Sequence, residues 1–139
     1  VDLSFGALVT ARTNADDNRV GNRCHFAMSH WADAVSGSFD LIVSNPPYIA
    51  SGVIPTLDEE VREHDPPLAL DGGPDGLEPY RILLREAGRL LAPRGLLVVE
   101  IGYDQADALV SLAGLSGLEI LRIAHDLSGN PRCVAMKRL

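Results

Sequence analysis

The tetrapeptide Asn45-Pro46-Pro47-Tyr48 combines residue types that could bind a planar amino group. The side-chain oxygen of Asn45 and the backbone carbonyl of Pro46 are two hydrogen-bond acceptors, and the proline ring holds the second one rigidly. Two fixed acceptors can hold both hydrogens of an NH2 group while Tyr48 lays its ring against the same plane. An amide held in this way directs its nitrogen at an electrophilic methyl group, because orientation lowers the barrier. The alternative is a turn that only ends a strand, and the residue types alone favour the two interpretations about equally.

The segments on either side of the tetrapeptide predict a position where ligands bind in α/β proteins. The apolar run Phe39–Ser44 predicts a strand that is buried on both faces, so the tetrapeptide follows at its carboxyl end. The residues after it, Ile49–Gly76, are rich in proline, glycine and aspartate and predict a long functional loop. Within this loop, Thr56–Arg62 is expected to form one or two helical turns.

Hydrophobic periodicity predicts alternating helices and strands in the rest of the chain. Helices are expected at Phe5–Asp17, which Ser4 would cap, at Glu78–Leu91 and at Gln105–Ala113. Strands that alternate with helices predict a mostly parallel sheet with helices on both faces, and the last two strands should pair as a hairpin with one of them antiparallel. The remaining strands are expected at Val1–Leu3, Cys24–Met28, Leu96–Ile101, Leu118–His125 and Cys133–Lys137.

Composition argues against several classes of function. The chain has 19 acidic and 12 basic residues, and its net charge of -7 disfavours binding to nucleic acid. No run approaches the roughly 18 apolar residues of a membrane span, and no signal peptide is recognisable, so we expect a cytoplasmic protein. Cys24 and Cys133 are far apart and show no metal-ligand spacing with the four histidines, which predicts buried free thiols and no metal site.

Several longer stretches resemble the release-factor glutamine N5-methyltransferase family. The run Phe39–Ile49 is similar to the hallmark of these enzymes, and the similarity continues through most of the chain. Its Asn-Pro-Pro-Tyr core is shared with DNA adenine methyltransferases, which also act on a planar NH2 group, so a DNA or RNA adenine methyltransferase is the alternative. The loop after Tyr48 is similar to that of the glutamine family and separates the two. The other matching stretches are Glu60–Arg62, Asp65–Leu77, Tyr80-Arg81, Leu97–Gly102 with Gln105, and Asp126–Gly129.

The resemblance implies a Rossmann-like fold and an enzyme that uses S-adenosyl-L-methionine to methylate a glutamine side-chain amide in a peptide chain release factor. Asn45 and the carbonyl of Pro46 would grip that amide, with Pro47 and Tyr48 completing the substrate site. The central motif is shared with methylases of ribosomal-protein glutamines, so both classes of protein substrate stay open.

The resemblance also implies residues for cofactor binding. Asp2 would accept hydrogen bonds from the ribose hydroxyls, and the alternative for Asp2 is a charge at the start of the first helix. Asn45 would also border the cofactor. Trp31 would line the adenine pocket, where the family has an acidic residue before the tryptophan. This chain has His30 there, which is either part of the pocket or a surface histidine.

The matching region begins after the family's glycine-rich cofactor loop. We therefore expect residues 1–139 to be one partial catalytic domain, its carboxy-terminal portion, with a sheet that lacks the first strand and the glycine-rich loop. Such a sheet exposes an edge, which predicts a homodimer formed through that edge. An inactive or self-associating fragment is the corresponding alternative function.

Overall fold

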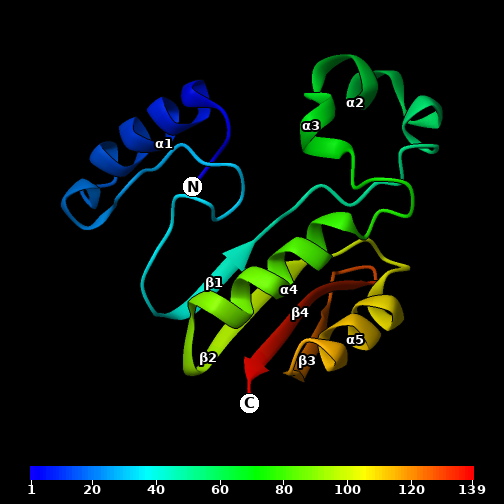
Figure 1. Ribbon diagram of the computed structural model, residues 1–139. Coiled ribbons are helices and arrows are strands. Elements are labelled where there is room, and N and C mark those ends of the chain that lie inside the picture. Colours follow the sequence, from blue (N-terminus) through cyan, green and yellow to red (C-terminus); the bar gives the residue numbers. More distant parts are fainter. The chain divides into compact units, whose positions relative to one another are not determined.

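The computed structural model describes residues 1–139, which form two compact units: an amino-terminal unit, Val1–Gly37, and a carboxy-terminal unit, Ser38–Leu139. In the amino-terminal unit, helix α1 (Phe5–Asp17) is followed by the short 3-10 helix η1 (Gly21–Arg23) (Figure 1). Ser4 begins α1 as expected, because its hydroxyl oxygen accepts a hydrogen bond from the backbone N–H of Ala7 at 3.3 Å.

The two strands that were expected in the amino-terminal unit do not form. Val1–Leu3 and Cys24–Met28 share only an isolated parallel bridge between Asp2 and Met28. Two backbone hydrogen bonds support it, from the N–H of Asp2 to the carbonyl of Ala27 at 3.3 Å and from Ser29 back to Asp2 at 3.1 Å. A strand requires a continuous ladder with a neighbour, and two hydrogen bonds do not make one.

The carboxy-terminal unit contains a four-stranded sheet in the order β1-β2-β4-β3. Strands β1 and β2 are parallel, and β4 is antiparallel to both β2 and β3. Three strands therefore run in one direction and β4 runs against them. The sheet is mixed, with one parallel and two antiparallel pairings, and it has the single antiparallel strand and the terminal hairpin that were expected. The strands are β1 (Phe39–Ser44), β2 (Leu91–Glu100), β3 (Leu118–His125) and β4 (Pro131–Arg138).

Strand β2 begins at Leu91 rather than at Leu96, where the apolar run predicted its start. Leu91 already pairs with Phe39, and the register between the two strands shifts before Leu96. Arg94 takes a positive φ of 66° inside the irregularity, and a Cβ on Gly95 would lie only 2.9 Å from the carbonyl oxygen of Phe39. Pro93, Arg94 and Gly95 form a bulge within the strand, just after the preceding helix has ended at Leu90.

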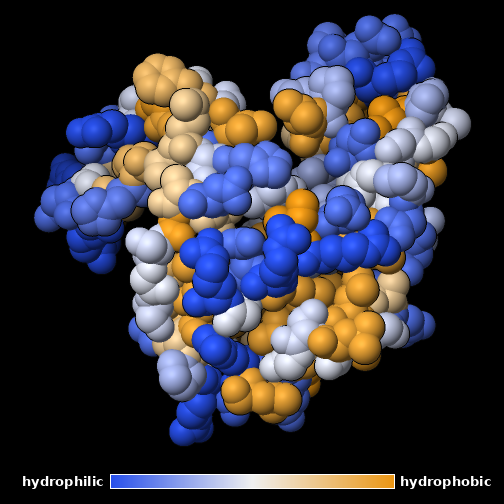
Figure 2. All heavy atoms as spheres, viewed as in Figure 1, coloured by the Kyte–Doolittle hydropathy of each residue, from blue (hydrophilic) through white to orange (hydrophobic).

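The segment between β1 and the next long helix is the expected loop, with short helical pieces: η2 (Ile54–Thr56), α2 (Glu59–His64) and α3 (Pro67–Leu70). Hydrophilic residues gather over α2, at the upper right of Figure 2. The acidic side chains of this part, Asp58, Glu59, Glu60 and Glu63, are exposed to solvent.

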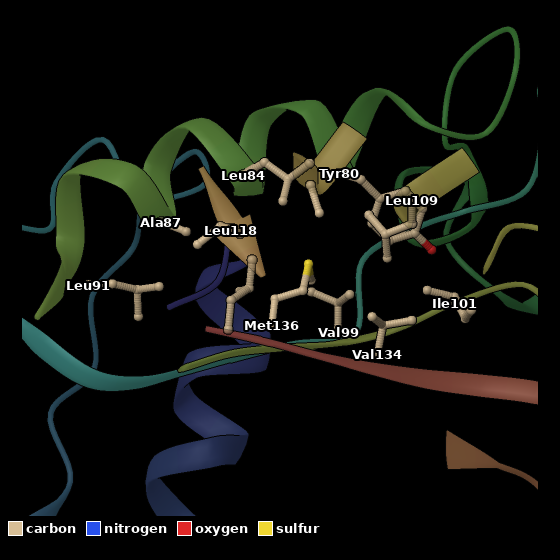
Figure 3. Packing of buried hydrophobic residues seen from close by; sticks show 12 residues of the cluster. Tyr80, Leu84, Ala87, Leu91, Val99, Ile101, Leu109, Leu118, Val134 and Met136 are labelled. Carbon is tan, nitrogen blue, oxygen red and sulfur yellow. The ribbon is translucent and has the colours of Figure 1, made fainter. Parts of the chain in front are cut away.

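Helices α4 (Glu78–Leu90) and α5 (Ala106–Leu115) cover one face of the sheet (Figure 1). Between them and the strands, apolar side chains from every layer meet in a single core (Figure 3). Burial of these side chains is the main force that holds the two helices on the sheet. The core consists of Tyr80, Leu84, Ala87, Leu91, Leu97, Val99, Ile101, Leu109, Ala113, Leu118, Val134 and Met136.

Replacing Leu97 with alanine should lower the free energy of unfolding by about 2–5 kcal/mol, because its fully buried side chain would leave a cavity in this core. Urea denaturation measures the change. The matched control is Leu127→Ala. Leu127 is fully exposed in the turn before β4, and its replacement should change stability by less than about 0.5 kcal/mol. Equal losses in both variants would show that the core has been assigned to the wrong face.

The opposite face of the sheet carries more exposed side chains, so the expectation that β1 is buried on both faces was wrong. Val43 of β1 pairs with Val98 of β2 and is 68% exposed. Both cysteines are free thiols, but each is half-buried, so the expectation of full burial was wrong. Strand β1 is the outermost strand on its side of the sheet, and the homodimer through such an edge stays a prediction. None of the helices combines the length and hydrophobicity that crossing a membrane requires.

Candidate active site at the end of strand β1

The tetrapeptide follows β1 directly, at the carboxyl end of two neighbouring parallel strands. Asn45 is exposed, Pro46 is buried, and Pro47 and Tyr48 are half-buried. Ligands of open α/β sheets bind beyond the carboxyl ends of the strands. The side chain of Asn45 is exposed and makes no hydrogen bond within the protein, so its amide is available to an external group.

Both ends of the tetrapeptide are attached to the rest of the unit. On one side, Ser44 pairs with Val99 in the parallel ladder of β1 and β2. On the other side, the N–H of Ile49 donates to the carbonyl of Leu70 at 3.0 Å, and the carbonyl of Ile49 accepts from the N–H of Gly72 at 2.8 Å. The loop thus closes at its base, beside the tetrapeptide.

A cleft of about 210 Å³ lies next to Asn45. The hydroxyl of Tyr48 donates to a carboxylate oxygen of Glu100 at 3.5 Å, which connects the tetrapeptide to another residue of this cleft. Apolar side chains from β1 and β2 and polar groups from β2 and β4 therefore line this cleft, at the carboxyl ends of β1 and β2. The lining residues are Val43, Ser44, Asn45, Val98, Glu100, Arg132 and Cys133.

A buried hydrogen-bond network lies behind the tetrapeptide, and sequence reasoning did not predict it. The hydroxyl of Tyr80 lies 3.1 Å from the backbone carbonyl of Glu100 and 3.1 Å from Oε1 of Gln105. Burial raises the pKa of the Tyr80 hydroxyl well above its usual value near 10. Tyr80 and Gln105 both belong to the stretches that resemble the family. Their contact joins α4 to the start of α5, and no local pattern in the sequence predicts it.

This pKa shift predicts a loss of stability in alkali. Below pH 10, Tyr80 is protonated in the folded and the unfolded chain, and above pH 10 only the unfolded chain releases the proton. Stability from this group is therefore full below pH 10 and falls as the pH rises. Tyr80→Phe should unfold more easily at neutral pH, by about 1–3 kcal/mol, yet lose less stability above pH 10.

Urea midpoints at neutral pH and above pH 10 measure both effects. Tyr103→Phe is the control, because Tyr103 is 66% exposed and its ring lies in water in both states. If Tyr80→Phe and Tyr103→Phe lose stability alike in alkali, burial of the Tyr80 hydroxyl does not cause the pH dependence.

The residues predicted for cofactor binding all lie in the amino-terminal unit, apart from Asn45. One carboxylate oxygen of Asp2 accepts from the backbone N–H of Ser4 at 2.8 Å, so this side chain does support the start of α1. His30 is exposed, its Nδ1 lies 3.5 Å from a carboxylate oxygen of Asp33, and its ring meets that of Trp31 edge-on at 6.3 Å. The bridge at Asp2 brings its backbone beside Met28, just before this pair of rings.

Known proteins are similar to this chain in sequence and in fold. The family model for the methyltransferase small domain matches residues 1–61. A release factor glutamine methyltransferase from Agrobacterium fabrum is 45% identical over 137 residues, which cover 99% of this chain and 47% of that protein. One from Rhodospirillum rubrum is 49% identical over 138 residues, which cover 99% of this chain and 42% of that protein. This chain belongs to the release factor glutamine methyltransferase family.

The chain spans a little under half the length of these curated relatives. In its fold it is similar to the solved structure of a ribosomal protein L11 methylase from Lactobacillus delbrueckii subsp. bulgaricus, with a TM-score of 0.70 and 18% identity over 98% of this chain and 55% of that one. A methyltransferase from Pyrococcus furiosus gives a TM-score of 0.67 at 17% identity, over 98% of this chain and 59% of that one. The likeness to both structures shows the methyltransferase fold.

Proposed function

We propose that the protein transfers a methyl group from S-adenosyl-L-methionine to the side-chain amide nitrogen of a glutamine in a peptide chain release factor. The observation that carries this proposal is an exposed Asn45 followed by two prolines and a tyrosine at the carboxyl end of β1, in a chain that is 45–49% identical to named release factor glutamine methyltransferases. The adenine methyltransferase alternative gains no support from these relatives.

The tetrapeptide would act by orientation. Oδ1 of Asn45 and the carbonyl oxygen of Pro46 accept the two N–H bonds of the glutamine amide, while the ring of Tyr48 packs against its plane. An amide nitrogen is a weak nucleophile because its lone pair is delocalised, so fixing its direction toward the methyl group matters greatly. The new N–C bond would form as the sulfur–methyl bond of the donor breaks, which would leave S-adenosyl-L-homocysteine as the other product. One N–H proton then leaves to water, and the product amide keeps the other.

The residues proposed for the cofactor fit its parts chemically. The exposed carboxylate of Asp2 can accept hydrogen bonds from ribose hydroxyls, and the half-buried ring of Trp31 offers an apolar surface to adenine. His30 beside that ring can donate a hydrogen bond where the family has an acceptor, and Asn45 would border the methyl donor. S-adenosyl-L-methionine would supply a methyl group that its sulfonium has already activated.

The test is transfer of labelled methyl from S-adenosyl-L-methionine to a purified release factor by the full natural protein, with mass spectrometry to locate the modified residue. The expected product has one methyl group on one glutamine side chain. A release factor with that glutamine replaced by alanine is the control and should take up no label. Label on a ribosomal protein or on adenine in DNA, with none on the release factor, would reject the proposed substrate.

A further inference from the structure

Gln105 joins the carbonyl of Tyr48 to the sheet and to the far end of the loop. Its Nε2 donates to the backbone carbonyl of Tyr48 at 2.9 Å and to that of Gly76 at 3.1 Å. Its Oε1 accepts from the N–H of Gly102 at 3.0 Å and from the hydroxyl of Tyr80 at 3.1 Å. Each amide atom thus faces partners of the opposite kind, and the side chain is only 8% exposed.

Two glycines of the loop, Gly72 and Gly76, pack closely against the backbone of Tyr48. A Cβ on Gly72 would lie 2.9 Å from the Cα and the carbonyl carbon of Tyr48. A Cβ on Gly76 would lie 2.5 Å from the carbonyl oxygen of Tyr48 and 2.7 Å from Nε2 of Gln105. Tyr48 is therefore enclosed by two close-packed glycines and by the hydrogen bond from Gln105.

This arrangement leaves the tetrapeptide few ways to move. Ser44 is fixed in the ladder with β2, and the rings of Pro46 and Pro47 fix their φ angles. The orientation of the Tyr48 peptide group therefore determines how the end of the tetrapeptide lies. The hydrogen bond from Gln105 to the Tyr48 carbonyl fixes this orientation. Any displacement there would turn the ring of Tyr48 and the acceptor of Pro46 relative to one another.

We infer that Gln105 is a positioning residue for methyl transfer, which it serves by fixing the Tyr48 carbonyl so that the tetrapeptide keeps its amide-binding geometry. The inference rests on the proposed function of the tetrapeptide. Gln105 lies behind the motif, and we expect it to change the rate of transfer more than the affinity for either substrate.

Gln105→Glu in the full natural protein separates the two halves of the network. A glutamate keeps an acceptor for Gly102 and Tyr80 but has no hydrogens to donate to the carbonyls of Tyr48 and Gly76. We expect kcat to fall by about 10- to 100-fold, because a misoriented amide reacts slowly. KM for the release factor should change less than about threefold.

Leu109→Val is the control for a loss of stability without a loss of positioning. Leu109 lies on α5 a turn after Gln105, is fully buried and packs in the core, so its variant should also lower the melting temperature. Its kcat should stay within about twofold of wild type, since lost core packing does not move the motif. A third variant, Gln105→Ala, removes both halves and should lose at least as much kcat as Gln105→Glu.

The outcomes are distinct. If wild type methylates the release factor and Gln105→Glu keeps its kcat, the positioning role is rejected while the proposed function stands. If Leu109→Val loses as much kcat as Gln105→Glu, the effect is one of stability and the role is again rejected. Absence of transfer by wild type, checked for folding, rejects the proposed function and this inference together.

Discussion

An Asn45→Ala variant should lose methyl transfer by about 100- to 1000-fold while its stability stays close to that of wild type. The loss follows because one of the two acceptors for the glutamine amide disappears, and the nitrogen is no longer directed at the methyl group. Stability should change little, because the Asn45 side chain is exposed and makes no hydrogen bond within the protein. Initial rates with a release factor and urea denaturation measure the two quantities.

Asn130→Ala provides a matched control within the same chain. Asn130 is also exposed and also precedes a proline, but it lies in the turn before β4. Its hydrogen bonds with Asp126 come from the backbone, so alanine keeps them. This variant should transfer methyl at the wild-type rate. Full activity in Asn45→Ala would contradict the proposal that the Asn45 side chain binds the glutamine amide.

Replacing Gly76 with alanine should produce the second large effect, on stability and on transfer together. Gly76 has a φ of +72°, a conformation that costs a residue with a Cβ about 1–2 kcal/mol. The new methyl group would also collide with the carbonyl oxygen of Tyr48 and with Nε2 of Gln105. Loss of their hydrogen bond adds about 1 kcal/mol, so we expect a total of about 3 kcal/mol.

Gly117→Ala isolates the backbone contribution. Gly117 has nearly the same φ, +71°, but a Cβ there would meet no atom within 4 Å. Its variant should lose only the cost of the left-handed conformation, about 1–2 kcal/mol, and keep wild-type transfer. Urea denaturation of both variants gives the comparison. Equal losses of stability would mean that the loop moves freely away from Tyr48, contrary to its close packing.

Local signals predicted the elements that carry the site. The apolar run Phe39–Ser44 ends at a pair of prolines, and the strand has these bounds in the structure. Helix α4 begins at Glu78 with a proline in its first turn, as expected. The tetrapeptide accordingly lies at the carboxyl end of β1, where it was predicted. These features depend on residues close together in the sequence, which is why the pattern contained them.

The contacts that hold the tetrapeptide depend on residues far apart in the sequence. Gln105 lies 57 residues after Tyr48, and Glu100 lies 52 after it. Periodicity placed Gln105 at the start of a helix and the resemblance included it, but neither gave its partners. The isolated bridge at Met28 shows the converse error, because an apolar run predicted a strand where a ladder of hydrogen bonds is absent. A strand depends on its neighbour, which local sequence does not specify.

The position of β4 between β2 and β3 determines the order in which the sheet can form. Strand β3 has no ladder with β2, so it joins the sheet only through β4. The β3–β4 hairpin is local and can form early, whereas pairing of β4 with β2 must close over α5 and β3 and is slower. During synthesis on a ribosome, the emerging β2 therefore keeps one edge open until Pro131–Arg138 has left the exit tunnel. That interval is when the nascent chain is most exposed to aggregation and to chaperones.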